Sequence, residues 1–373
     1  MKMALIISNL GQGGAERVLS LLANYFCEKN NVTIIKLDNA PSFYEISPKI
    51  RVIDANLGVG DMGIIGNFKK RFGKIFAIRK LFKSQNFDII ISFLDNTNVL
   101  SLIANFGLKT PLIISEHTNH TFLKARIWRV LKRIFYPRAS GLSVLTRFDY
   151  DFYTYVKNRE IMPNPAFSSL IDEQNLKKMC QNKRDLILAV GRLEPFKGFD
   201  TLIRAISLIP PQSLKNYEII IAGDGHERKN LENLAHNLGV KVQFAGFCKD
   251  IANLYAQAKI VVVTSRAEGF CNILAESIFF DTARISTDCI AGPRDLITHE
   301  KDGILCAVDD EKEIAKAINL LINDENCRLN LVKNANLRRD ELSLKTIGKK
   351  WEIFIDKTLQ MRQNRTNSFK ISN

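Results

Sequence analysis

The sequence predicts an α/β protein with two domains, each built on a doubly wound parallel sheet, and a ligand cleft between them. Short β-rich runs alternate with longer helical patterns along the 373 residues, and this alternation runs through twice. A stiff segment around Pro163 and Pro165 separates the halves. The length also suits two domains, since single cores rarely grow beyond about 250–300 residues.

The elements follow one another in strand–helix order. In the first half, strands are expected over 4–8, 31–36, 51–53, 88–93, 111–115 and 141–145, with a helix over 15–28. In the second half, strands are expected over 185–190, 218–222, 240–245, 260–264, 283–286 and 303–306. Helices fit 201–207, 227–238, 275–280 and 311–322. We therefore expect an N-terminal domain over 1–162, a C-terminal domain over 163–348, and a last segment over 349–373. That segment is a helix over 351–359 that can pack back on the first domain, followed by a mobile polar tail.

Composition limits the class of protein. Hydrophobic residues make up 46% and charged residues 25%, an ordinary globular balance. The longest apolar runs have the length of strands, well short of the roughly 20 residues that a membrane-spanning helix needs. The N-terminus is typical of a first strand and not of a signal peptide. Seven scattered cysteines without C-x-x-C spacing predict neither a zinc site nor disulfides, and favour a reducing cytoplasm.

The most informative motif is the segment 268–276, in which Glu268 and Glu276 stand eight residues apart. A helix that starts near Cys271 places Glu276 within its first two turns and leaves Glu268 in the preceding loop. Backbone N–H groups of that first turn then point into the gap, as at phosphate sites. A carboxylate pair beside a phosphate site suggests sugar-nucleotide chemistry; the plain alternative is an acidic loop before an ordinary helix.

Three further loops follow predicted strands of the second half. Arg192 and Lys197 in segment 191–198 present two cations suited to a diphosphate. Segment 222–225 is a sharp turn suited to nucleotide contact, and segment 288–295 contains Gly292. The alternative for each loop, taken alone, is a solvated turn without a ligand. All of them, with the loop before Glu276, are expected at one edge of one sheet.

These motifs together resemble glycosyltransferase family 4, retaining enzymes with the GT-B fold of two facing Rossmann-like domains. The resemblance rests on 190–198, 222–225, 268–276 and the Gly292 loop. It implies that Arg192 and Lys197 hold the donor diphosphate, that Glu276 binds the nucleotide ribose and that Glu268 contacts the transferred sugar. The implied donor site also includes Gly191, Gly223, Asp224, Gly225, Gly269, Phe270, Asn272 and Ile273. Cys271 departs from the family pattern, where proline is common, without removing a charge.

The first half is similar to the bacterial N-acetylgalactosaminyltransferases that extend undecaprenyl-diphosphate-linked glycans for protein N-glycosylation, through segments 13–17, 91–98 and 108–119. Related enzymes of lipopolysaccharide and capsule assembly share many of these residues. His117 follows a strand and is implied to contact the donor phosphate or the reacting sugar, with a purely structural histidine as the alternative. Asp95 and Asn96 are expected to contact the acceptor sugar, with a turn as the alternative.

The loop containing Gly13 and Gly14 opens a helix after the first strand, which suits a nucleotide or an anion. A nicotinamide-dinucleotide site deserves comparison, because Asp38 follows the second strand. The spacing is G-x-G-G, however, and a dinucleotide fingerprint needs G-x-G-x-x-G. A simple tight turn is the remaining alternative.

Positive charge is concentrated in the first half, where 23 Lys and Arg residues stand against 12 Asp and Glu, a net charge of +11. One basic segment carries Phe68, Phe72, Ile75 and Phe76 at helical spacing among Lys69, Lys70, Arg71 and Lys74. A second, over 122–135, interleaves aromatic and aliphatic residues with Lys124, Arg126, Arg129, Lys132 and Arg133. Such helices suit an anionic membrane surface and a lipid diphosphate. Two solvated helices are the alternative.

The resemblance thus implies transfer of GalNAc from UDP-GalNAc to an undecaprenyl-diphosphate-linked glycan, and the basic segments favour an enzyme held peripherally at the cytoplasmic face of the inner membrane. No resident cofactor or metal is expected. A hexosyl- or HexNAc-transferase of lipopolysaccharide or capsule assembly is the alternative within the class. An NAD-dependent oxidoreductase leaves Glu268 and Glu276 unexplained. A nucleic-acid partner is not expected, since no recognition module is found.

Overall fold

The computed structural model describes residues 1–57, 64–122 and 126–371, with the side chains of all but 64–71, 126, 169 and 365–371. These residues form two compact units. The first comprises residues 1–163 together with 344–373, and the second comprises residues 164–343. The chain therefore leaves the first unit beside Pro163 and returns to it at Leu344.

The first unit is built on a seven-stranded sheet with every strand parallel to its neighbours, in the order β3-β2-β1-β4-β5-β6-β7. The strands are β1 (Lys2–Ile7), β2 (Asn31–Lys36), β3 (Arg51–Asp54), β4 (Ile89–Phe93), β5 (Leu112–Ser115), β6 (Gly141–Val144) and β7 (Arg159–Ile161). Six were predicted. The seventh, β7, was missed because three residues of mixed polarity give no periodic signal.

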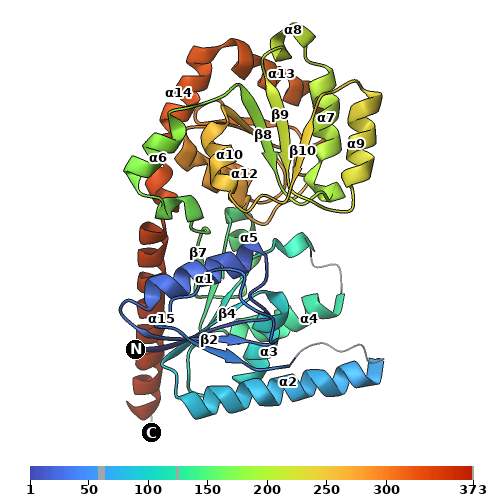
Figure 1. The fold of residues 1–373 in the computed structure, drawn as a ribbon. Coiled ribbons are helices and arrows are strands. Elements are labelled where there is room, and N and C mark those ends of the chain that lie inside the picture. The colour runs from blue at the N-terminus through green and yellow to red at the C-terminus, as the bar shows by residue number, and fades with distance from the viewer. Residues whose placement is uncertain (58–63, 123–125, 372–373) are drawn as a thin grey trace. The chain divides into compact units, whose positions relative to one another are not determined.

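Helices cover both faces of this sheet (Figure 1). On one face, α1 (Gly14–Phe26) and α15 (Leu344–Ile371) pack on apolar side chains of β1 and β4. On the other face lie α2 (Ile64–Gln85), α3 (Asp95–Ala104), α4 (Arg126–Phe135) and α5 (Arg147–Phe152). Trp351 and Phe354 of α15 are buried in the first core, which explains why the returning helix belongs to this unit. Helix α15 is longer than the expected 351–359, since it continues to Ile371, and the mobility of the polar tail stays a prediction.

The second unit repeats the topology with six parallel strands in the order β10-β9-β8-β11-β12-β13. The strands are β8 (Leu186–Val190), β9 (Glu218–Ala222), β10 (Gln243–Gly246), β11 (Ile260–Val263), β12 (Ala283–Thr287) and β13 (Ile304–Cys306). Relative to its first strand, the order matches that of the first unit, so both sheets are wound outward from a central strand. A ligand site at the carboxyl ends of the central strands is the expectation for this topology.

Helices also cover both faces of the second sheet. On one side, α7 (Phe199–Ser207), α9 (Arg228–Asn237), α13 (Glu311–Asn323) and α14 (Glu325–Asn336) enclose one apolar cluster. The other helices are α6 (Glu173–Cys180), α8 (Pro211–Leu214), α10 (Ile251–Gln257), α11 (Asn272–Ser277) and α12 (Pro293–Leu296). Among them, α10 contacts β8 and α11 contacts β11. The short 3-10 helices are η1 (His120–Phe122), η2 (Tyr136–Arg138), η3 (Phe167–Leu170), η4 (Pro195–Lys197), η5 (Ile278–Phe280) and η6 (Arg339–Leu342).

Candidate functional site

Four loops of the second unit meet at the carboxyl edge of its sheet, where they follow β8, β9, β11 and β12. Three backbone hydrogen bonds join them: from Leu193 to Asp224 (3.0 Å), from Arg266 to Phe196 (2.7 Å) and from Glu268 to Ile290 (3.2 Å). The prediction that these loops share one edge is therefore confirmed. Because each loop is bonded to the next through the main chain, the side chains they carry are held in one place.

The glycines of these loops permit close approach of the backbone. Gly223 has a φ of 141°, and a Cβ there would collide with the carbonyl oxygen of Gly191. The neighbouring Asp224 accepts a hydrogen bond from the N–H of Gly225 (2.8 Å) and keeps an exposed carboxylate. At Gly292, a Cβ would collide with the backbone of Phe270. A larger residue at either contact would push two loops of the edge apart.

Lys197 and Glu268 form the central ion pair of this edge. The ammonium of Lys197 lies 2.6 Å from Oε1 of Glu268, and both side chains are largely enclosed. Ser265 donates a hydrogen bond to the same carboxylate oxygen (2.6 Å). Pro195 and Gly198 bound the single turn η4 that brings Lys197 here, and Gly198 occupies the left-handed region with a φ of 64°. The structure thus joins two residues that the sequence analysis assigned to one site.

Arg192 lies on the same loop and remains exposed. Its guanidinium carbon is 6.0 Å from the centre of the Phe196 ring, and the ammonium of Lys197 is 5.4 Å from the same ring. Both cations are therefore close to one aromatic side chain, which limits how far they spread apart. The loop presents two positive charges within reach of one small anionic ligand.

Arg266 was missed by the sequence analysis, although it makes the densest set of contacts on this edge. Its guanidinium binds the carboxylate of Asp200 through two nitrogens (3.0 and 2.8 Å) and that of Asp309 through Nε (2.8 and 3.1 Å). It also donates to the carbonyl oxygen of Pro195, in the turn that carries Lys197. No local sequence pattern indicates this role, because Asp200 and Asp309 lie more than 40 residues away from Arg266 in the chain.

The helix expected near Cys271 begins there. Cys271 is the N-cap of α11 in the left-handed region (φ 65°), and Asn272 and Ile273 form its first turn after the buried Phe270. Asn272 accepts a hydrogen bond from the side-chain amide of Asn164 (2.9 Å), and Gly269 joins Phe270 to the ion-paired Glu268. Burial, followed by the nearby Glu268 charge, raises the pKa of the Cys271 thiol well above its usual range. The thiol is therefore neutral and unsuited to nucleophilic attack.

Glu276 lies on α11 in surroundings different from those of Glu268. It is buried, and its Oε2 accepts a hydrogen bond from the hydroxyl of Tyr255 on α10 (3.2 Å). The hydroxyl of Ser168 donates to its carbonyl oxygen (3.1 Å). Two carboxylates eight residues apart are thus given different partners, which fits two roles better than one paired acid and base.

In the first unit, the loops after β4 and β5 carry the other predicted residues. Asp95 is the first residue of α3, and its carboxylate binds Lys132 (2.7 Å) and accepts a hydrogen bond from Thr118 (3.2 Å). Asn96, the next residue, is exposed. The bond to Thr118 brings the β4 and β5 loops together at the carboxyl edge of the first sheet.

Glu116 and His117 follow the end of β5 and have different neighbours, since Glu116 is bonded to Tyr136 whereas His117 lies against Phe93. Its ring is stacked on Phe93, with centres 5.3 Å apart, and its Nε2 lies 3.0 Å from the hydroxyl of Ser115. Its Nδ1 is enclosed and has no hydrogen-bond partner among the described residues. Burial lowers the pKa of His117 to about 4, against a smaller opposing effect of Glu116. The imidazole is therefore neutral near physiological pH.

Gly13 is the N-cap of α1, and Gly14 is its first residue. The carbonyl oxygen of Gly13 accepts a hydrogen bond from the hydroxyl of Tyr44 (3.1 Å). Glu16 in the first turn lies against Gly13, and burial raises the pKa of its carboxyl. The Gly13–Gly14 loop is therefore an ordered helix start, and the carboxylate of Glu16 lies close to its main chain.

The two basic segments form the helices α2 and α4. Phe72 and Phe76 of the predicted apolar stripe are 51% and 67% exposed, while Ile78 and Phe82, further along the same helix, are buried. The side chains of Lys69, Lys70 and Arg71 lie outside the described residues, and Lys74 is half-buried.

On α4 the outward side carries Ile127, Val130 and Ile134, which are 58%, 53% and 47% exposed. Their spacing of three and four residues places them on one exposed apolar stripe. Lys124 lies outside the described residues, and Arg129 and Arg133 are exposed. Lys132 is 4% exposed, so its expected position on the basic surface is wrong.

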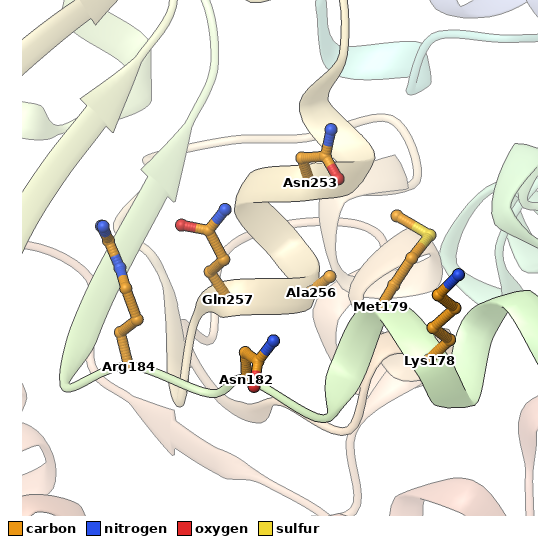
Figure 2. A pocket seen from close by; sticks show the side chains of 7 residues that line it. All are labelled: Lys178, Met179, Asn182, Arg184, Asn253, Ala256 and Gln257. Atoms are coloured by element: carbon orange, nitrogen blue, oxygen red, sulfur yellow. The ribbon is translucent and has the colours of Figure 1, made fainter.

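A cavity of about 530 Å³ lies at the other end of the second unit, between the segment before β8 and helix α10 (Figure 2). Its lining residues are Lys178, Met179, Asn182, Arg184, Asn253, Ala256 and Gln257. Since these residues precede β8 and β11, the cavity is at the amino edge of the sheet, away from the Lys197–Glu268 pair. It takes no part in the candidate site.

Within the described residues, no cluster of three or more His, Cys, Asp and Glu side chains is placed to hold a metal ion. In the same part of the chain, no helix is both long and apolar enough to cross a membrane. The structure describes all seven cysteines, and each is a free thiol.

Comparison with known protein families gives two matches. Residues 12–155 match the model described as "Glycosyltransferase Family 4", and residues 171–338 match "Glycosyl transferases group 1". The chain is 40% identical over 352 residues to a Campylobacter jejuni protein named GalNAc-α-(1→4)-GalNAc-α-(1→3)-diNAcBac-PP-undecaprenol α-1,4-N-acetyl-D-galactosaminyltransferase; the match covers 94% of this chain and 97% of the relative.

A second C. jejuni relative, N-acetylgalactosamine-N,N'-diacetylbacillosaminyl-diphospho-undecaprenol 4-α-N-acetylgalactosaminyltransferase, is 28% identical over 88% of this chain and 92% of its own. Among solved structures, Anabaena HepE in complex with UDP matches with a TM-score of 0.73 at 20% identity, over 96% of this chain and 100% of that chain. Sucrose-phosphate synthase from Thermosynechococcus elongatus matches with a TM-score of 0.77 at 18% identity, over 99% of both chains. The predicted fold of two Rossmann-like parallel-sheet domains is confirmed.

Proposed function

We propose that this chain, which belongs to glycosyltransferase family 4 and has the GT-B fold, transfers GalNAc from UDP-GalNAc to an undecaprenyl-diphosphate-linked oligosaccharide with retention of anomeric configuration. The observation that carries the proposal is the enclosed Lys197–Glu268 pair at the meeting point of four loops. The acceptor class and the sugar are supported by the printed names of the two Campylobacter relatives.

The donor is assigned to the second unit. Lys197 and Arg192, which approach one Phe196 ring, contact the diphosphate and stabilise the negative charge that develops on departing UDP. Glu268, oriented by Ser265, contacts the transferred sugar. Glu276 binds the ribose. No carboxylate is assigned as a covalent nucleophile; the acceptor attacks on the face that UDP leaves, and the leaving phosphate assists.

The acceptor is assigned to the first unit. Asp95 and Asn96 contact the acceptor sugar, and the neutral imidazole of His117 hydrogen-bonds the donor phosphate or the reacting sugar. The exposed stripe Ile127–Val130–Ile134, flanked by exposed arginines on α4, enters the interface of an anionic membrane. The enzyme is then held at the cytoplasmic face of the inner membrane, where its lipid-linked acceptor is found.

The test is transfer by the purified full-length chain from a panel of UDP-sugars to a panel of undecaprenyl-diphosphate glycans, with products identified by mass. GalNAc addition from UDP-GalNAc supports the proposal. Exclusive use of UDP-glucose or UDP-galactose would overturn the sugar assignment and favour a transferase of lipopolysaccharide or capsule assembly. Proton NMR of the product's anomeric signal decides between retention and inversion.

A further inference from the structure

Lys132 makes an ion-pair network inside the first unit, and the proposed function assigns a role to Asp95 but none to Lys132 itself. It belongs to the basic helix α4, yet its side chain is 5% exposed. The ammonium donates to Oδ1 of Asp95 (2.7 Å), to Oε2 of Glu116 (2.6 Å) and to the hydroxyl of Tyr153 (3.3 Å). All three ammonium hydrogens therefore have an acceptor.

Glu116, whose side chain is 1% exposed, lies at the centre of the network. Its Oε1 accepts hydrogen bonds from Asn98 (3.0 Å) and from the hydroxyl of Tyr136, and its Oε2 also accepts one from Tyr153 (3.3 Å). Two carboxylates share one cation here. Burial and the Glu116 charge raise the pKa of Asp95, whereas Lys132 lowers the pKa of Glu116 against the effect of burial.

Such a network is poorly explained by stability alone. Removing two carboxylates and an ammonium from water costs several kcal/mol for each ion, and apolar residues of similar volume often serve a core equally well. Its position suggests a different reason. The ammonium joins the start of α3 after β4, where Asp95 lies, to the loop after β5, which contains Glu116 and His117.

Asp95 is the member of the network that reaches solvent. Its side chain is 20% exposed, and Thr118 holds its second oxygen (3.2 Å). One edge of a fixed carboxylate is thus presented at the carboxyl ends of adjacent strands, the edge at which open parallel sheets bind ligands. A carboxylate held by two groups loses little freedom when a sugar hydroxyl binds to it.

We propose that Lys132 is a positioning residue for the acceptor: it fixes Asp95 and the Glu116–His117 segment in one arrangement, so that helix α4 contributes to the site from inside the fold. This inference rests on the assignment of Asp95 and His117 to acceptor and donor contacts under the proposed function. Under this inference α4 has two faces with separate roles: its outward apolar stripe contacts the membrane, and the inward ammonium of Lys132 orders the acceptor site.

The experiment compares Lys132→Met with the double variant Lys132→Met/Glu116→Gln in the full-length chain. The single variant leaves two carboxylates without their counter-charge and is expected to unfold at lower temperature. The double variant removes the second charge while Gln keeps acceptors for Tyr136 and Asn98, so its melting temperature is expected to recover. A positioning role predicts that kcat/KM for the lipid-linked acceptor stays at least about tenfold below wild type in the double variant, with KM for UDP-GalNAc unchanged.

The matched control is Lys49→Met, which removes a lysine from an exposed ion pair with Glu28 (2.9 Å) in the same unit and is expected to behave as wild type. Hydrogen exchange over 94–98 and 116–119 provides a readout that does not depend on turnover, and faster exchange is expected in both Lys132 variants. Recovery of both melting temperature and acceptor kcat/KM in the double variant, or unchanged exchange in either variant, would overturn the inference. A wild-type chain without transfer to any acceptor would instead reject the proposed function, and hydrogen exchange would still decide whether Lys132 orders the two loops.

Discussion

The ammonium of Lys197 lies 2.6 Å from a carboxylate oxygen of Glu268, although 71 residues separate the two in the chain. The pair exists because loops after β8 and β11, adjacent strands of one sheet, reach the same edge. Ser265 adds a second donor to that oxygen, so the carboxylate is oriented before any ligand arrives. A cation and an oriented acceptor at one edge are what a nucleotide-sugar donor needs.

Lys197→Met is expected to lower kcat by about a hundredfold or more, because removing one group that stabilises developing charge usually costs that much. Glu268→Gln should show a loss of similar size. Steady-state kinetics with UDP-GalNAc gives the values. Lys259→Met is the matched control, since it breaks an ion pair of equal length with Asp185 at the other edge of the same sheet. Full activity in the Lys197 variant would refute the assignment.

Arg266→Met should release the turn that carries Lys197, because its guanidinium holds Pro195, Asp200 and Asp309 together. We expect kcat/KM for the donor to fall by about ten- to a hundredfold, as small misplacements of catalytic groups do. Arg266→Lys keeps the charge without the planar fork and should recover only part of the loss. Equal activity of the Lys and Arg forms would show that charge, and not geometry, is what matters here.

His117 predicts a pH dependence of stability. Its pKa in the folded chain is about 4, against about 6.5 in an unfolded chain. Between these values the unfolded chain binds a proton at this residue and the folded chain does not, so stability falls as pH drops from about 6.5 towards 4. Above about 6.5 the contribution is complete. Urea titrations at several pH values give the free energy of unfolding of wild type and of His117→Asn. In this window the free energy of unfolding should change less steeply with pH for the variant than for wild type. The same dependence on pH in both proteins would contradict the burial argument.

The apolar stripe on α4 predicts membrane binding. Replacing Ile127, Val130 and Ile134 together by serine should reduce co-sedimentation with anionic phospholipid vesicles at least about tenfold, since exposed apolar area drives interfacial attachment. Serine replacements of Leu320 and Leu329, which are 45% and 55% exposed on the second unit, serve as the control. An unchanged vesicle fraction in the α4 variant would mean that this stripe faces something other than lipid.

Periodicity and turn residues in the sequence determined most of the fold. Twelve of the thirteen strands in the described part of the chain were predicted, because buried parallel strands form short apolar runs between helices. A helix start near Cys271, between the two glutamates, was also expected, and Cys271 is the N-cap of α11. Motifs at strand ends placed four loops on one edge, because parallel strands of a sheet present their carboxyl ends together.

Only the tertiary structure decided which of the charged residues point inward. Lys132 was counted with a basic surface, although it shares a helical face with Trp128 and Phe135, which pack on the core. That spacing was a usable signal. No such signal existed for Arg266, since its acceptors come from distant loops. Local pattern determines elements and edges, whereas burial of a charge depends on partners that only folding brings within hydrogen-bond distance.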